Sequence, residues 1–316
     1  MLFRVKVTPL SLFTSPIESY TIFSAICWGY RILFGEKKLL EFLEKFKEKP
    51  LFMISSPLPY LQNKLYFPMP EVEDGFEEPE DEEEYKLHKS IKKLKWIPET
   101  IFYEFLKGNI NKKSDLLKLE FFKEFKNGIS FPKSINLLHA KINRLTWTTG
   151  EGGLYNESAY FYDNFIFFIY FNEENFIEPI KYILRFVPFG GNKSIGFGRK
   201  ILEFKEEKGI LTDFLIPSSS SKKFITLSPT FYDASFNLKE SFYQLLLFAG
   251  KVENFYGRIT EPILKKKVIY LKTGSVLKVK SIKNFYGELK SVLEHQDKTI
   301  YQYGFAFPLY IKNGGN

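Results

Sequence analysis

The chain has 316 residues and a formal net charge of +8, with 45 lysines and arginines against 37 aspartates and glutamates. Hydrophobic residues make up 44% of the sequence and aromatic residues 18%, which excludes a disordered chain and indicates a well-filled core. The single cysteine, Cys27, excludes an internal disulfide and a multi-thiolate zinc site. The excess of positive charge favours a polyanionic partner.

The charge is distributed unevenly along the chain. Residues 71–84 contain ten acidic residues and no basic one, so the remainder has 45 basic against 27 acidic residues, or +18. We predict an acidic surface insertion near residues 71–95. Arg4 and Lys6 interrupt any signal-peptide core, and no stretch reaches about 18 uncharged apolar residues. We therefore expect a soluble cytoplasmic protein with no membrane partner.

The first part of the chain alternates predicted strands and helices. Residues 2–7 alternate apolar and basic side chains, the period of a strand with one buried face. Residues 20–34 are apolar nearly all round and predict an interior helix. The frequent prolines of residues 57–70 predict a surface segment with little regular structure. Further elements are predicted as helices at 37–47, 96–106 and 116–125, and a strand at 51–54.

A long hairpin is predicted near residues 133–170. It consists of a strand at 135–147, a glycine turn at 149–153 and a strand at 154–170. A helix at 175–185, a glycine-rich loop and a strand at 200–204 follow. The order strand, helix, strand, strand, helix, strand is that of a ferredoxin-like domain, here with long insertions after its first helix.

The remaining residues are rich in predicted strands. They are expected at 225–227, 242–248, 267–271, 276–279 and 304–311, after a polar boundary within residues 208–223. We predict an α+β protein of two ferredoxin-like, RNA-recognition-type domains, residues 1–210 and 211–316, of which the second is degenerate.

The glycine-rich loop is the most distinctive candidate site. Its glycines permit close backbone approach, and its cations can neutralise phosphates. The candidate residues are Gly190, Gly191, Lys193, Ser194, Gly196, Gly198, Arg199 and Lys200. Phe197 stands where a P-loop requires lysine, and Ile201 stands where a dinucleotide fingerprint requires its third glycine. A flexible helix-to-strand connection is the alternative interpretation.

The predicted hairpin supplies a second candidate surface. Basic groups interleaved with an aromatic residue can hold an RNA backbone and stack on a base. Here they are Lys133, Lys141 and Arg144, with Asn143 and Trp147 close to them in the sequence. A solvated hairpin with no ligand explains the same composition.

Signals for catalysis are weaker. His139 in the hairpin is the only candidate for general acid/base chemistry on RNA, and no partner for it is fixed by spacing. We interpret Cys27, on an apolar helix, as a small core residue. The acidic run lacks the glycine punctuation of an EF-hand loop, so we predict neither a metal site nor a cofactor.

Several short motifs together resemble one family. Residues 21–28 and 34–36, the Ile-Ser-Ser-Pro at 54–57 and the segment 65–70 resemble subunit four of the type III-A CRISPR Csm effector complex. Residues 143–146 with 152–155 look like the hairpin motif of the RAMP superfamily, and residues 190–199 look like its glycine-rich loop. Residues 225–229 and 273–276 resemble signatures of the C-terminal half. In the hairpin, Trp147 stands where the superfamily often has glycine.

This resemblance implies a Cas five-like RAMP protein that is not an enzyme. Such a subunit is expected to hold the 5′ repeat-derived tag of the guide crRNA. It would also link the large polymerase-like subunit to the neighbouring backbone RAMP subunit. Two alternatives stay open: a guide-processing endoribonuclease that uses His139, and an adaptor that contacts only proteins.

Overall fold

The largest sheet is built around two antiparallel neighbours, β1 (Leu2–Pro9) and β8 (Phe165–Phe171). The computed structural model describes residues 1–119, 128–217, 221–252, 264–295 and 298–312. β9 (Lys200–Glu206) pairs with the free edge of β1, whereas β2 (Phe52–Ile54) and β3 (Leu58–Leu61) both pair with β8. Two further strands, β4 (Lys64–Pro68) and β5 (Trp96–Pro98), complete a seven-stranded sheet in the order β5-β4-β3-β8-β1-β9.

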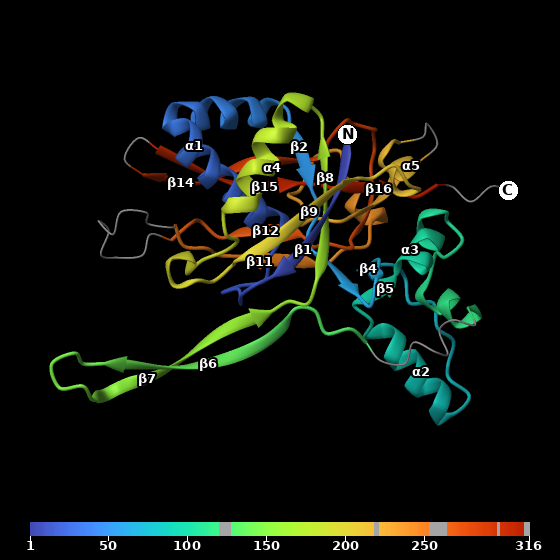
Figure 1. The fold of residues 1–316 in the computed structure, drawn as a ribbon. Helices are drawn as coiled ribbons and strands as arrows, with labels where there is room; N and C mark the ends of the chain where they lie inside the picture. The colour runs from blue at the N-terminus through green and yellow to red at the C-terminus, as the bar shows by residue number, and fades with distance from the viewer. Residues whose placement is uncertain (120–127, 218–220, 253–263, 296–297, 313–316) are drawn as a thin grey trace.

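Two helices cover one face of this sheet, α1 (Ser19–Glu48) and α4 (Ile177–Phe186) (Figure 1). Alternate residues of β1 and β8 point to that face and join its core, as the period of two requires. The helices approach closely at Gly29, where an added Cβ would lie 2.3 Å from Cγ2 of Ile183. Gly35, with φ of 84°, kinks α1 between the two helices that the sequence predicts.

The opposite face of the sheet is also buried, which explains why β8 is an unbroken apolar run. Ile166 and Phe168 of β8 pack in a second core with α3 (Glu99–Leu106). Residues of the C-terminal half, including Ile225 and Leu309, complete this core. A strand covered on both faces reads as continuous hydrophobic sequence rather than as alternation.

Three small antiparallel sheets form the C-terminal half, and one short helix, α5 (Leu211–Leu215), precedes them. Their strands are β10 (Lys223–Thr226) between β13 (Val276–Lys278) and β16 (Pro308–Tyr310), β11 (Leu245–Phe248) with β12 (Val268–Leu271), and β14 (Gly287–His295) with β15 (Lys298–Phe305). The sequence does not predict β14, and of β15 it predicts only the last two residues. Tyr303 and Phe305 of β15 pack on Phe23 and Phe46 of α1, so the two halves of the chain share a core.

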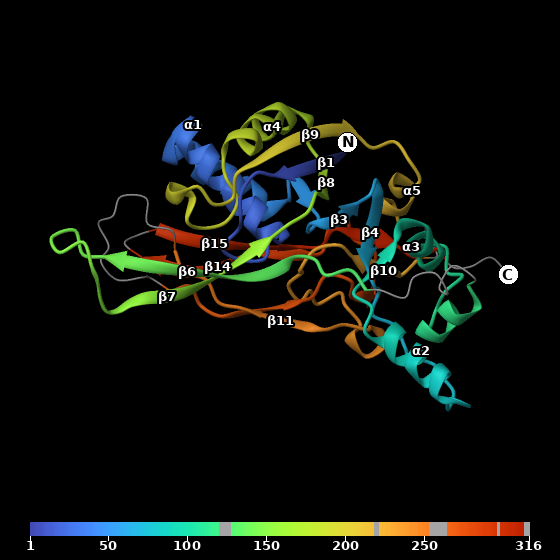
Figure 2. The ribbon, with the colours of Figure 1, turned by 60° about the horizontal axis from the view of Figure 1, so that its bottom comes forward.

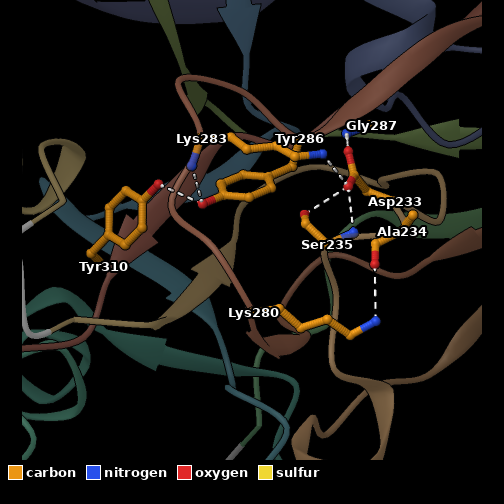
Figure 3. A network of polar contacts seen from close by, with 8 residues as sticks. All are labelled: Asp233, Ala234, Ser235, Lys280, Lys283, Tyr286, Gly287 and Tyr310. Atoms are coloured by element: carbon orange, nitrogen blue, oxygen red, sulfur yellow. Dashed lines mark hydrogen bonds and ion pairs between the residues drawn. The ribbon is translucent and has the colours of Figure 1, made fainter.

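A polar network around Asp233 fixes two loops of the C-terminal half (Figure 3). The Asp233 carboxylate accepts hydrogen bonds from the Ser235 amide at 2.8 Å and pairs with Lys283 Nζ at 2.7 Å. The Lys283 amide donates to the hydroxyl of Tyr286, a fully buried side chain. Partial burial opposes ionisation of Asp233, but the Lys283 and Ser235 hydrogen bonds outweigh it and lower the pKa of the carboxyl.

We expect Asp233→Asn to lower the free energy of unfolding by about 1–3 kcal/mol near neutral pH, because hydrogen bonds to a charged group are lost. A lowered folded-state pKa contributes stability above the unfolded pKa, and that stability is lost as the pH falls through the folded value. The difference between the variant and the wild type should therefore shrink in acid. Urea unfolding at neutral and acidic pH measures it. Asp213→Asn, at an exposed position of α5, is the control, and a difference that stays constant with pH would exclude the ionic role.

The hairpin comprises β6 (Lys133–Ile142) and β7 (Thr149–Phe161), and it extends beyond the body of the protein in both views (Figures 1 and 2). The predicted end of the hairpin at residue 170 is wrong. The second hairpin strand, β7, ends at Phe161, and the residues that follow form β8, which pairs with β1 in the central sheet. The predicted turn at 149–153 is also wrong. The chain reverses at residues 143–148, where the Asn143 amide bonds to the Thr148 carbonyl at 3.0 Å and Asn143 Oδ1 accepts from the Leu145 amide.

The segment predicted to be irregular, residues 57–70, instead forms β3 and β4 of the large sheet. Pro59 and Pro68 are tolerated because they lie at strand positions where no ladder donor is needed. The acidic insertion is partly helical, since α2 (Glu82–Lys92) begins at an Asp81 N-cap whose side chain accepts from the Glu84 amide. Glu73 and Asp74 form ion pairs with Lys112 and Lys113, which hold the start of the insertion to the body.

Three other predictions need adjustment. The end of the helix at 20–34 is not interior, because Ile32 is 60% exposed and Leu33 and Phe34 are 45% exposed. Residues 96–106 divide into β5 and α3. The helix predicted at 116–125 lies mostly outside the described residues. Its first three residues belong to the 3₁₀ helix η1 (Lys113–Lys118). Among the helices that the structure describes, none is long and apolar enough to cross a bilayer.

Candidate nucleic-acid interface

The glycine-rich loop, residues 190–199, connects α4 to β9 through four residues in the left-handed region. Gly190, Asn192, Gly196 and Gly198 have φ values of 81°, 54°, 97° and 75°. Between them Lys193–Ile195 form one 3₁₀ turn, η4. Positive φ at these positions requires glycine or asparagine, so the composition of the loop follows from its backbone.

The loop is anchored to the connection between β1 and α1. The Gly198 amide donates to the Leu12 carbonyl at 2.9 Å, and the Phe189 amide donates to the Gly198 carbonyl at 3.0 Å. The Arg199 amide donates to Ser11 Oγ at 2.9 Å, and the Gly191 amide donates to Thr14 Oγ1 at 3.1 Å. These bonds come from residues far apart in sequence, and they define a fixed loop rather than a flexible connection.

The candidate side chains of the loop differ in their availability. Gly191, Ser194 and Arg199 are exposed, and no heavy atom lies within 4 Å of a Cβ built on Gly196. Lys193 is half-buried and lies over the ring of Trp28, with Nζ 5.9 Å from its centroid. The Gly191, Gly196, Gly198 and Arg199 amides donate to partners within the protein, so the groups left to meet phosphate oxygens are the Arg199 and Lys193 side chains, beside the open space at Gly196.

Lys200 differs from the other candidates. Its side chain is only 8% exposed, and Nζ donates a hydrogen bond to the Val187 carbonyl at 2.5 Å above the ring of Phe189. Burial, with a smaller effect of Lys193, lowers the pKa of Lys200 to about 7. The structure thus corrects the expectation that its charge faces a ligand, and we do not count it among the surface cations.

The candidate residues of the hairpin lie at both of its ends. Lys141, Asn143 and Arg144 are exposed at the tip, together with Trp147, which is 82% exposed. Trp147 has φ of 56°, in the left-handed region that glycine adopts most easily. Lys133 lies at the base, where Nζ is 3.4 Å from Asp163 Oδ2 and above the ring of Phe161.

Glu157 in β7 joins the hairpin to the glycine-rich loop. One oxygen, Oε1, accepts a hydrogen bond from Asn192 Nδ2 at 2.7 Å, and the other, Oε2, lies 3.2 Å from His139 Nε2. The two predicted surfaces therefore meet at the middle of the hairpin. No local sequence pattern indicates the contact between Glu157 and Asn192, because it spans 35 residues.

The described side chains suited to nucleophilic or acid/base chemistry include His139, His88 and Cys27. His139 Nε2 lies 3.2 Å from Glu157 Oε2, and the imidazole stacks on Tyr155 at a centroid distance of 5.3 Å. A second histidine, His88, is buried in α2 against Phe76. Burial raises the pKa of the Cys27 thiol to about 12, so it stays protonated. Among the described residues no cluster of three or more metal-ligating side chains occurs.

The family model of the RAMP superfamily matches residues 8–203. The chain belongs to the RAMP superfamily. Its structure resembles Csm4 in the Csm3-Csm4 subcomplex of the type III-A CRISPR-Cas interference complex, with a TM-score of 0.63 and 19% identity over 97% of this chain and 98% of that one.

Further structures show the same fold. Csm4 in the Csm1-Csm4 cassette with cA4 gives a TM-score of 0.61 and 19% identity, covering 98% of both chains. A chain of the type III-B Cmr-beta complex bound to target RNA gives 0.51 and 14% identity, covering 87% of this chain and 86% of that one. No curated protein sequence shows a significant match.

Proposed function

We propose that this chain is a non-catalytic RNA-binding subunit of a type III CRISPR complex of the Csm type, acting in antiviral defence in the cytoplasm. It would take the place that Csm4 has in the related complexes and hold the 5′ repeat-derived tag of the guide crRNA. The observation that carries the proposal is the anchored glycine-rich loop, which presents exposed Arg199 and half-buried Lys193 beside the open space at Gly196 in a RAMP-family chain.

The proposed division of the chain is two ferredoxin-like domains, residues 1–210 and 211–316. In the first, the elements β1, α1, β2, β8, α4 and β9 follow the order of that fold, and the hairpin and the acidic insertion lie between β2 and β8. The second would be a degenerate copy, because its strands form several small sheets. The proposed site lies in the first domain.

Two protein partners follow from the relatives. Structures titled as Csm1-Csm4 and Csm3-Csm4 assemblies contain the similar chains. We propose that this chain likewise connects a large polymerase-like subunit to a backbone RAMP subunit. Co-expression with each partner, followed by size-exclusion chromatography, tests both contacts.

We expect Arg199→Ala to weaken binding of repeat-tagged guide RNA and to reduce the slope of log affinity against log salt by about 0.7, the value for one lost phosphate contact on a single strand. Fluorescence anisotropy over a salt series measures both quantities. Lys312→Ala is the matched control, because Lys312 is an exposed cation that packs on Phe214 of α5. An unchanged slope for Arg199→Ala would count against the assignment.

The endoribonuclease alternative has its own test. Incubation of the pure protein with repeat RNA should give no specific cleavage if the proposal holds. Cleavage that His139→Ala abolishes would replace the proposal with a processing enzyme. Sequencing of RNA that co-purifies from the native host separates an RNA-binding subunit from an adaptor that contacts only proteins.

A further inference from the structure

A pocket of about 400 Å³ lies at the base of the hairpin. One wall is the end of β1 and the loop after it, residues 9–12, and the other is the connection from β7 to β8, residues 161–164. We call it the hairpin-base pocket. Its volume is within the range of small-molecule sites and is sufficient for one nucleobase.

The pocket adjoins two cations from the candidate interface. The Arg199 backbone bonds to both Leu10 and Ser11 in one wall, with N···O distances of 2.9 Å. Lys133 reaches Asp163 in the other wall at 3.4 Å. An RNA strand that contacts both residues would therefore lie close to the two walls of the pocket.

The lining combines an aromatic face with polar groups. Phe161 is 43% exposed; Lys133 Nζ lies 5.8 Å from the centroid on one face of its ring, so the other face is the one available for stacking. Asp163 and Asn164 follow it directly, and the Asn164 side chain is exposed while its backbone carbonyl accepts from the Tyr60 amide at 2.9 Å. Single-stranded RNA is recognised in this way, by stacking on aromatic rings and by hydrogen bonds to base edges.

The carboxylate of Asp163 decides which part of an RNA fits. An ionised carboxylate only accepts hydrogen bonds and repels phosphate, so a phosphate group is a poor occupant. Adenine and cytosine present an amino group that can donate to a carboxylate, whereas the corresponding uracil position is an acceptor oxygen. Lys133 partly neutralises the Asp163 charge and lets the RNA backbone remain nearby.

We propose that the hairpin-base pocket receives one unstacked nucleobase, with Phe161 as the stacking face and Asp163 as the acceptor for a base amino group. The proposal rests on the proposed function, because it requires single-stranded RNA beside Arg199. It adds sequence preference to a surface whose other contacts are with the RNA backbone.

The test uses the full chain and three short labelled oligonucleotides, of adenylate, cytidylate and uridylate, in anisotropy titrations at one salt concentration. We expect Phe161→Ala to weaken binding of all three by about tenfold, the effect of one lost stacked base. Asp163→Asn should shift the ratio of cytidylate to uridylate affinity toward uridylate by about tenfold, because the amide can donate to uracil and holds an amino group less strongly.

Matched controls are Phe186→Ala, an exposed phenylalanine of α4, and Asp213→Asn in α5. Both should leave all affinities unchanged, and circular dichroism confirms that each variant is folded. If Asp163→Asn alters the three oligonucleotides equally, or Phe161→Ala alters none, the base pocket is wrong while RNA binding stands. If the wild type binds none of them, the proposed function fails as well.

Discussion

Replacing Gly198 with alanine should lower the free energy of unfolding by about 2–5 kcal/mol, because positive φ and overpacking both penalise a side chain there. A Cβ on Gly198 would lie 2.0 Å from the Phe189 carbonyl oxygen, and φ is 75°. Relief would break the hydrogen bonds from Gly198 to Leu12 and from Phe189 to Gly198, which anchor the loop. RNA affinity should fall with stability. Urea unfolding and anisotropy on the same preparation measure the two effects.

Gly196→Ala is the control for this prediction. Gly196 also has positive φ, 97°, but a Cβ there meets no heavy atom within 4 Å. Only the conformational cost of about 1–2 kcal/mol is expected. Equal losses for the two variants would mean that the close approach to Phe189 does not determine the stability of the loop.

We expect Phe46→Ala to destabilise both halves of the protein by about 3–5 kcal/mol, the cost of a cavity left by a buried phenylalanine. Phe46 is fully buried, and its ring centroid is 4.9 Å from those of Phe23 and Phe52. It also contacts Phe305 of β15 at 5.7 Å. Because residues 1–210 and 211–316 share this core, unfolding should remain one transition that shifts as a whole.

Calorimetry measures this effect, with Phe186→Ala as the comparison. Phe186 is 67% exposed, so its truncation should change stability by less than about 0.5 kcal/mol. Two separate transitions, of which only one moves in Phe46→Ala, would show that the halves unfold independently and would contradict the shared core.

Elements with strong local signals could be predicted from the sequence. The alternation of residues 2–7 predicts β1, the amphipathic pattern of residues 175–185 predicts α4, and the glycines of residues 190–198 predict the loop. Residues 58–68 are the opposite case, since their prolines indicate a loop although the residues form a strand pair closed by positive φ at Gln62 and Asn63. Here the pairing of β3 with β8 outweighs the low strand propensity of proline.

The candidate site was predictable only in part, and the reason is geometric. The exposure of Arg199 and Arg144 could be predicted, because each is a basic residue beside the turn-forming residues of a loop or hairpin. The Ser11 contact with Arg199 spans 188 residues and the Asn192 contact with Glu157 spans 35, so no local pattern contains them. For Lys200 the local pattern predicted a surface cation, but the side chain is buried against Phe189, which is eleven residues away in the sequence.

The position of β1 has a consequence for synthesis of the chain. Leu2 pairs with Tyr170 and Phe3 pairs with Glu206, so both neighbours of this first strand are translated long after it. At about 5–20 residues per second, β1 waits on the order of ten seconds or more for its partners. During that time both edges of a strand with one apolar face lack their partners. The alternating Arg4 and Lys6 place charges on its other face, and these charges oppose pairing with other nascent chains.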